Sequence, residues 1–225
     1  VAWRSGALRG LRSHTRALAA LGLSEIVLPF PLIAFGEQHV SSSLAAILIA
    51  ALPLTIALIA IRFDPEERVT GWRLAGLFVG LGGVVALFGI DVSGSLDEAI
   101  GALCILLATV GYAIATMIIK RRLAGAGDPF ALVAVALAFA AIMLAPAAAL
   151  TAPREMPTGA AIAALIVLGL VCTALAFVLW FTLIAEVGPS RASVITYINP
   201  AVAVALGVTL LGESLSAGAV AGLLL

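Results

Sequence analysis

Long apolar runs alternate with short polar segments along the whole chain. Seven runs of about 19–26 residues are long enough to cross the ~30 Å core of a bilayer as helices. They lie at residues 18–36, 41–61, 72–90, 99–119, 130–151, 160–185 and 190–211, and a shorter eighth run lies at 217–225. We therefore predict an all-α, polytopic membrane protein with about seven complete spans and a truncated eighth.

The composition excludes a soluble globular domain. Of the 225 residues, 63% are hydrophobic and 11% are charged, whereas a soluble fold needs many polar residues to cover its outside. Twelve basic residues balance twelve acidic residues, so no charge excess points to a nucleic-acid partner. The expected partners are the lipid bilayer and a small-molecule substrate.

Basic residues concentrate in every second connection. The connections at 1–17, 62–73, 120–128 and 186–191 carry four, three, three and one, and those at 37–40, 91–98, 152–158 and 212–216 carry none, none, one and none. This asymmetry follows the positive-inside rule and places residues 1–17 in the cytoplasm. Eleven of the twelve basic residues are arginine, which is typical of a GC-rich bacterial genome, so we expect a multi-pass protein of the bacterial inner membrane.

One stretch of the chain recurs near its far end. Ser41–Arg62 and Gly188–Val208 are both apolar runs with small polar residues at the start and one proline in the middle. When Pro53 is laid on Pro200, 147 positions later, several serine and alanine positions also coincide. Mid-membrane prolines at equivalent places in two copies are the sequence pattern that marks a transporter's binding site.

The two copies are predicted to have opposite orientations in the membrane. The match continues to Glu67, in a cytoplasmic connection, and to Glu213, in an outer one. Inversion requires an odd number of helices per copy, and the second copy, counted from residue 99, has five helices with the last cut short. The first copy shows only three, so we expect about two further helices before Val1 and a sequence truncated at both ends.

The family resemblance lies in the first copy and in its doubling. Leu28–His39 reads LPFPLIAFGEQH, and Ser41–Leu48 reads SSSLAAIL. Together with the doubled pattern of proline, glutamate and glycine-rich helix, these stretches resemble EamA-type proteins of the drug/metabolite transporter superfamily. The resemblance implies a ten-helix fold of five-plus-five inverted repeats that moves small metabolites by alternating access. Ser24 and Glu25 stand where such proteins often have asparagine.

The resemblance divides the chain into four parts. Residues 1–17 are a cytoplasmic loop, 18–90 are the remainder of the first EamA-like repeat with three helices, 91–98 are an outer connection, and 99–225 are the second repeat with four helices and a truncated fifth. It also implies that the parts outside this sequence are helices one and two and most of helix ten.

Two prolines and two stripes of hydroxyl side chains form the predicted cavity lining. Proline has no N–H, so Pro53 and Pro200 each leave the carbonyl four residues earlier without its helical partner. The stripes are Thr109, Tyr112 and Thr116 on one helix, and Ser193, Thr196 and Tyr197 with Asn199 at the edge on another. A narrow polar stripe faces protein or water rather than lipid. Its hydroxyls either bind a substrate or hydrogen-bond between helices, at about 0.6–2 kcal/mol each.

Glu25 is the only carboxylate well inside a predicted span. An ionised, unpaired carboxylate there costs at least about 2.5–3.5 kcal/mol, so Glu25 faces a cavity, finds a partner or takes a proton. We interpret it as a proton-coupling candidate, and the alternative is an ordinary hydrogen bond between helices or a partner on the helices expected before Val1. Trp180 shares a helix face with Thr173 and Phe177, where it either walls the cavity or anchors the helix at the membrane interface.

We expect no cofactor and no metal site, because histidine is scarce and Cys104 and Cys172 are interpreted as packing residues. Gly76 and Gly80 permit close helix contact, either within the bundle or in a homodimer. The sequence has no H-E-x-x-H, G-x-S-x-G or Walker A motif, so we predict neither an enzyme nor direct use of ATP.

These features favour a secondary-active exporter of a small neutral or zwitterionic metabolite or amphiphile, with proton coupling as one mode. No lysine or arginine lies at the centre of a span, which disfavours the nearest alternative, an exchanger of anionic or phosphorylated metabolites. A channel or a non-transporting membrane scaffold is the other alternative, and it explains the inverted duplication poorly.

Overall fold

The computed structural model describes residues 12–40, 42–64, 66, 68–88, 95–151 and 156–211. Over these residues the chain is helical apart from turns and short connections, which confirms the predicted all-α class. Five helical stretches are long and apolar enough to cross a membrane: Thr15–Gly36, Leu44–Phe63, Leu96–Leu123, Pro129–Leu150 and Gly159–Val187. The described part is therefore a polytopic membrane helix bundle.

Part of the sequence prediction falls outside the described residues. This applies to residues 1–11 of the opening loop, to Glu67, to residues 91–94, to Glu213 and to the last run at 217–225. The opposite orientation of the two copies and the domain boundaries accordingly stay predictions.

The helices form two compact units. The first contains η1 (Arg12–His14), α2 (Thr15–Gly22), η2 (Leu23–Val27), the last turn of α7 (Leu96–Ile118), η4 (Ile119–Leu123), α8 (Pro129–Leu150), α9 (Gly159–Val167), η5 (Leu168–Leu175) and α10 (Ala176–Val187). The second contains α3 (Pro29–Gly36), α4 (Ser42–Ala50), α5 (Leu52–Phe63), α6 (Trp72–Phe88), most of α7, α11 (Pro189–Ala192) and α12 (Ile195–Leu211).

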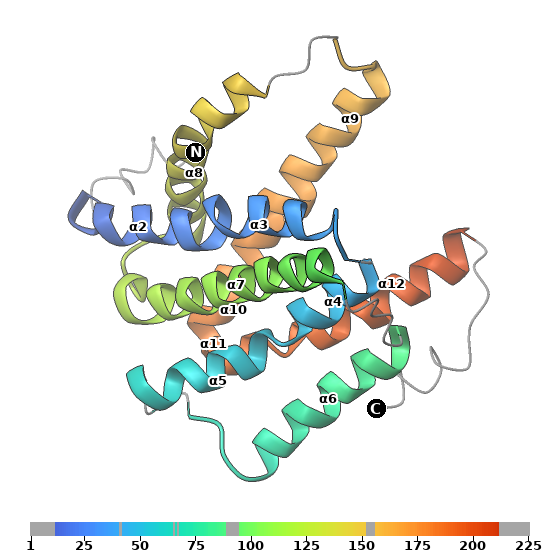
Figure 1. Cartoon of the computed structure of the whole chain (residues 1–225). Helices are drawn as coiled ribbons and strands as arrows, with labels where there is room; N and C mark the ends of the chain where they lie inside the picture. The colour runs from blue at the N-terminus through green and yellow to red at the C-terminus, as the bar shows by residue number, and fades with distance from the viewer. Residues whose placement is uncertain are drawn as a thin grey trace. The chain divides into compact units, whose positions relative to one another are not determined.

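The first unit is built around the contact of α2 with α8, and α10 also packs on α8 (Figure 1). Leu18 and Leu21 are fully buried on α2, and Ala136 and Ala140 are buried on α8. Gly22 makes the approach close, because a Cβ there would lie 2.9 Å from the carbonyl oxygen of Ala136. Small residues at such a crossing let two membrane helices pack backbone to backbone.

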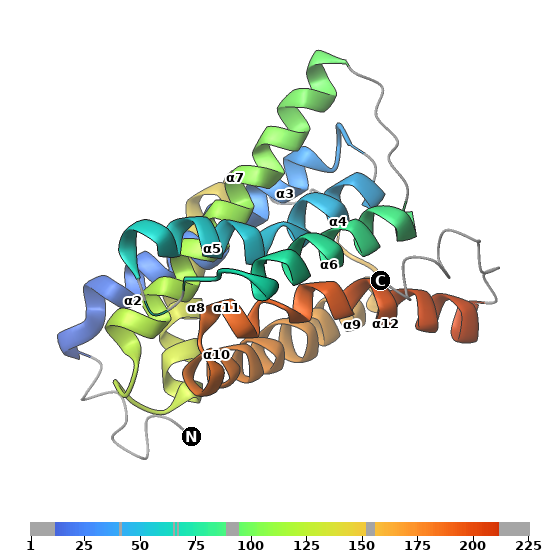
Figure 2. The ribbon, with the colours of Figure 1, turned by 90° about the horizontal axis from the view of Figure 1, so that it is seen from below.

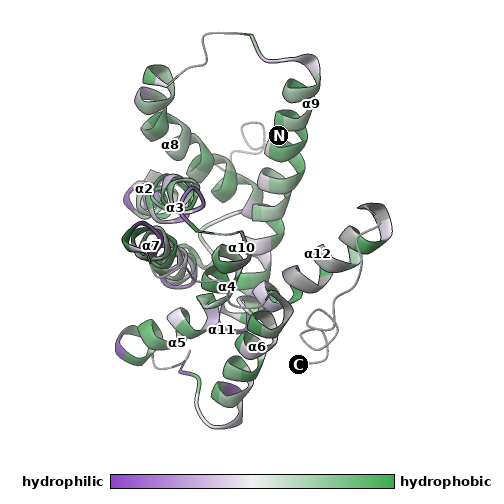
Figure 3. Ribbon diagram, turned by 45° about the vertical axis from the view of Figure 1, so that its right-hand side comes forward, coloured by the Kyte–Doolittle hydropathy of each residue, from purple (hydrophilic) through white to green (hydrophobic). Residues whose placement is uncertain are grey.

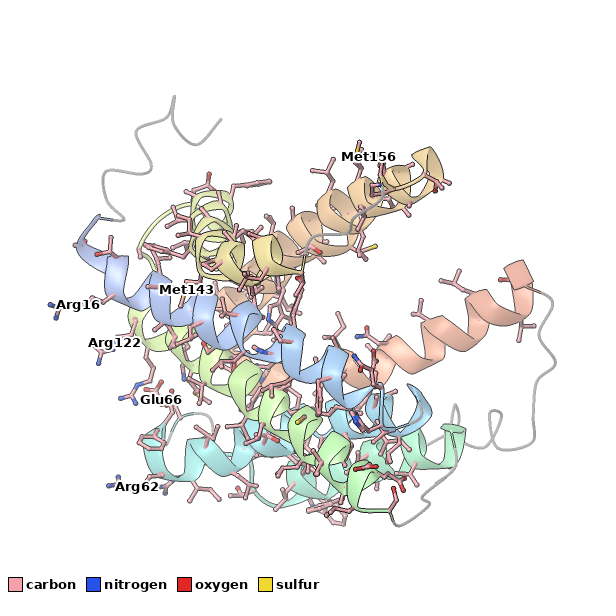
Figure 4. All side chains as sticks on the ribbon, turned by 45° about the horizontal axis from the view of Figure 1, so that its top comes forward. Arg16, Arg62, Glu66, Arg122, Met143 and Met156 are labelled. Carbon is pink, nitrogen blue, oxygen red and sulfur yellow. The ribbon has the colours of Figure 1, made fainter. Side chains whose placement is uncertain are left out.

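One end of the first unit carries basic side chains. Arg16, at the start of α2, and Arg122, in η4, lie at the same end, and Met156 lies at the opposite end (Figure 4). This arrangement agrees with the cytoplasmic and outer sides that the charge pattern predicts.

The α9 helix has little protein around it. The distance between α9 and α8 increases toward the N-terminal end of α9, and apolar residues run along most of the length of α9 (Figure 3). No residue of Gly159–Val167 is buried. A helix that is apolar all round is stable in hydrocarbon, where its backbone polar groups are satisfied internally.

The second unit is organised by α4, which packs against α5, α6 and α12 (Figures 1 and 2). Ile47 and Ala50 are buried beside Leu81, Val85 and Tyr197. A second cluster joins Val40 and Ala45 to Ile105 of α7. These clusters join α4 to α6, α7 and the proline-bearing α12.

The starts of α7, α8 and α9 carry side-chain caps. The Ser95 hydroxyl accepts a hydrogen bond from the Glu98 N–H at 3.1 Å, the Asp128 carboxylate accepts from the Phe130 N–H at 3.1 Å, and the Thr158 hydroxyl accepts from the Ala161 N–H at 3.3 Å. Each cap satisfies one of the N–H groups that a first helical turn leaves without a partner. These caps explain why α7, α8 and α9 begin within a few residues of the predicted runs.

The predicted helix at 41–61 is interrupted at Ala51, between α4 and α5. Pro53 is the cause, because it has no N–H and its ring clashes with the carbonyl four residues earlier. The Ala51 N–H donates a hydrogen bond to the carbonyl of Leu48, three residues back, at 3.2 Å. The hydroxyl and the N–H of Thr55 both donate to the carbonyl of Ala51, at 3.1 and 3.0 Å.

The prediction of a single helix at 190–211 is wrong. The chain forms the short α11, turns at Ser193 and Val194, and continues as α12 straight through Pro200. Two side chains stabilise the turn: the Ser193 hydroxyl donates to the carbonyl of Ser190 at 3.1 Å, and the Thr196 hydroxyl donates to that of Ser193 at 2.8 Å. The two prolines therefore act differently, and only Pro53 lies directly at a break.

Candidate functional site

Glu25 lies in η2, a π-helical segment between α2 and α3. The sequence explains the segment, because Pro29 cannot supply the N–H that the carbonyl of Glu25 would otherwise receive. Ser24 reinforces it by donating its hydroxyl to the carbonyl of Ala20 at 2.8 Å. Short π-helical turns inside α-helices frequently occur at functional sites.

The Glu25 side chain is only 4% exposed and is partly satisfied. Trp180 of α10 hydrogen-bonds to its carboxyl group, and since indole is only a donor, the carboxylate is the acceptor. The second oxygen, Oε2, is the one buried side-chain nitrogen or oxygen of the described residues that has no hydrogen-bond partner. Both residues belong to the first unit.

In the part of the chain that the structure describes, no basic side chain of a neighbouring helix neutralises Glu25. Pro129–Leu150 of α8, which packs on η2, has no titratable side chain. The charged side chains of α2 and α10 are Arg16 and Glu186, and both are exposed. Cys172 of η5 is exposed as well. The carboxylate is thus enclosed by apolar helices with one indole as its polar neighbour.

The described residues contain two further π-helical segments, η4 and η5, and η5 occupies the equivalent place in the second predicted copy. The repeat offset of 147 carries Leu23–Val27 to residues 170–174, which lie inside Leu168–Leu175. In η5 the Thr173 hydroxyl donates to the carbonyl of Leu168 at 2.9 Å, five residues back. The same offset carries the start of α4 at Ser42 to Pro189, where α11 starts. These two features coincide with the predicted repeat, whereas the break at Ala51 has no counterpart in α12.

The hydroxyl stripe on α7 is buried. Thr109 and Thr116 are fully buried, and Tyr112 is half-buried. The Thr109 hydroxyl lies 3.0 Å from the carbonyl of Ile105 and 3.4 Å from that of Leu48 on α4. The Thr109 hydroxyl therefore forms a hydrogen bond between helices, which was one of the two predicted alternatives.

Tyr197 also bonds between helices. Its hydroxyl donates to the carbonyl of Leu77 on α6 at 2.9 Å. Gly80, one turn further along α6, makes room for the ring, because a Cβ there would overlap it. Of the predicted glycine pair, Gly80 serves this contact, while a Cβ at Gly76 would meet open space.

The candidate residues divide between the two units. Glu25, Thr116 and Thr173 belong to the first, and Pro53, Thr109, Tyr112, Ser193, Thr196, Tyr197, Asn199 and Pro200 belong to the second. Pro53 and Ser193 are buried and Asn199 is exposed. The hydrogen bond from Trp180 to Glu25 was not predicted. The one indication of it in the sequence was Trp180 itself, an aromatic residue with an N–H donor in the third helix of the second predicted copy.

Metal ions have no evident binding site in the described residues. No group of three or more histidine, cysteine, aspartate or glutamate side chains that could hold a metal ion occurs among them.

Comparison with known proteins gives a consistent relationship. The model of the EamA-like transporter family matches residues 99–225. The chain is 27% identical to the uncharacterized transporter YoaV of Bacillus subtilis (strain 168) over 197 residues. This alignment covers 86% of this chain and 67% of that protein. It is 29% identical over 181 residues to the uncharacterized inner membrane transporter YedA of Escherichia coli (strain K12), which covers 80% of this chain and 58% of that protein.

The chain thus spans 58–67% of the length of these two relatives. A solved crystal structure matches with a TM-score of 0.78 at 22% identity, over 90% of this chain and 72% of that one, and it shows the same fold. The predicted location, a multi-pass protein of the bacterial inner membrane, is confirmed by the apolar helices together with the inner-membrane relative. With a family model that covers more than half of its residues, the chain belongs to the EamA-like transporter family.

Proposed function

We propose that the protein is a secondary-active transporter that exports a small neutral or zwitterionic metabolite or amphiphile by alternating access. The observation that carries the proposal is the pair of π-helical segments η2 and η5, which lie at equivalent places if the predicted repeat is applied. Discontinuous helices near the middle of the bilayer, repeated in two related halves, are how many transporters build a binding site. The transporter relatives agree with this proposal.

The charge distribution supports the substrate class. Within the five apolar stretches the basic residues lie near the ends, as Arg16, Arg62 and Lys120–Arg122 do. An anionic or phosphorylated metabolite needs a cationic group near the centre of the site. The described spans supply none there, so an exchanger of such anions is the weaker candidate.

Glu25 is the proposed proton-coupling group. A carboxylate between apolar helices loses its charge when it binds a proton. Otherwise a bound cation has to balance that charge. Coupling of this kind requires that the carboxylate be reached alternately from the two sides of the membrane.

Counterflow in liposomes tests the proposal. Metabolites that raise the melting temperature of the complete protein in a screen of amino acids, amines and nucleosides are then assayed for exchange. Saturable exchange supports a carrier, linear flux indicates a channel, and no flux with any thermal-shift hit refutes transport.

Glu25→Gln should abolish the dependence of exchange on a pH gradient. Glu37→Gln is the matched control, because Glu37 is exposed at the end of α3.

A further inference from the structure

The carboxylate of Glu25 uses only part of its hydrogen-bonding capacity. An ionised carboxylate accepts at both oxygens, at about four lone-pair sites. Trp180 supplies one donor, and Oε2 has none among the described residues. A buried acceptor without a partner costs about 1–3 kcal/mol, and more when it is charged. The arrangement therefore suits a ligand that brings N–H donors.

The surroundings define the charge of that ligand. The α8 helix offers no titratable side chain, and Arg16 of α2 is exposed. A carboxylate in this setting gains more from a cation than from a neutral donor, because the apolar helices strengthen the attraction between opposite charges.

We propose that Glu25, held by the hydrogen bond from Trp180, binds the protonated amino group of the transported solute. The inference rests on the proposed function and narrows it, because the substrate then carries an ammonium group, either as an amine or as a zwitterion. The ammonium N–H groups donate to Oε2, and its charge balances the carboxylate. A proton and the ammonium group compete for this one carboxylate, which links their movements across the membrane.

Trp180 provides a direct readout of binding. In the complete protein, every tryptophan other than Trp180 is replaced by phenylalanine, and the emission of Trp180 is followed in detergent. Four probes of similar size and apolar character are compared: 2-phenylethylamine, its N-trimethyl derivative, 2-phenylethanol and 3-phenylpropionate. The primary amine should change the emission saturably and bind most tightly, because it alone combines positive charge with N–H donors.

Substitution at Glu25 separates this role from a structural one. Glu25→Gln should weaken binding of the amine by about tenfold or more, the effect of losing a hydrogen bond to a charged partner. Glu25→Asp keeps the charge and should keep the preference for the amine over the alcohol. Glu37→Gln should leave the affinity unchanged.

Three results would overturn the inference: equal binding of amine and alcohol, no saturable response to the amine, or amine affinity unaffected by Glu25→Gln. If Glu25→Gln does not fold, the comparison of the probes in the parent protein and in Glu25→Asp decides the matter. Selective amine binding without counterflow would refute the proposed transport alone. Counterflow of a neutral solute without amine binding would refute the ammonium site alone.

Discussion

The crossing of α3 and α7 at Gly36 and Gly101 should be among the least tolerant contacts in the second unit. A Cβ at Gly101 would lie 2.8 Å from the Cβ of His39, 2.9 Å from the carbonyl oxygen of Gly36 and 3.0 Å from Cγ1 of Val40. Two of these neighbours are fixed to the backbone and cannot rotate away. Gly101→Ala therefore requires the two helices to move apart.

The expected cost follows from two opposing effects. Overpacking costs about 1–3 kcal/mol, whereas alanine gains about 0.5–1 kcal/mol over glycine inside a helix. Because the contact involves backbone atoms, we expect a net loss of about 1–2 kcal/mol. For a protein of this size that loss lowers the melting temperature by roughly 2–8 °C.

Thermal unfolding of the purified protein in detergent measures the effect. Gly82→Ala in α6 is the matched control, because a Cβ there meets nothing within 4 Å. It should leave the melting temperature unchanged or raise it slightly. A Gly101→Ala variant as stable as Gly82→Ala would show that α3 and α7 do not pack at this distance.

Three further predictions concern other contacts. Tyr197→Phe removes the hydrogen bond to Leu77 and should lower stability by about 0.6–2 kcal/mol in the same unfolding assay; an unchanged melting temperature would contradict it. Thr109→Val should cost about 0.6 kcal/mol or more through the lost bond to α4, and a stabilised variant would exclude that bond. In intact cells of a cysteine-free background, Met156→Cys should react with a membrane-impermeant maleimide and Arg122→Cys should not, and the reverse would invert the topology.

The fold was largely predictable from the sequence because apolar run length and charge asymmetry are strong signals in a membrane protein. The predicted run at 130–151 is the α8 helix at Pro129–Leu150, and the run at 160–185 lies within Gly159–Val187. The turn at Ser193 was not predictable in this way. It depends on local hydroxyl–carbonyl bonds inside an apolar run, which hydropathy does not register.

The candidate site was predictable in part. Glu25 stood out because a carboxylate within a span is costly and rare. Its bond to Trp180 joins residues far apart in the sequence, and no local pattern reports such a pairing. Tyr197 was assigned to the cavity by its helical face, but the same face contacts Gly80 of α6. Periodicity identifies a face that avoids lipid without saying whether protein or solute covers it.

The π-helical segments η2 and η5 change how the faces of their helices must be assigned. One additional residue in a turn advances the side-chain direction by about 100° relative to a continuous α-helix. A helical wheel drawn through Leu23–Val27 or Leu168–Leu175 with a single period therefore misplaces every residue beyond the segment by more than a quarter of a circle. Wheels for these two helices have to be phased separately on each side, and variants meant to probe one surface should be chosen accordingly.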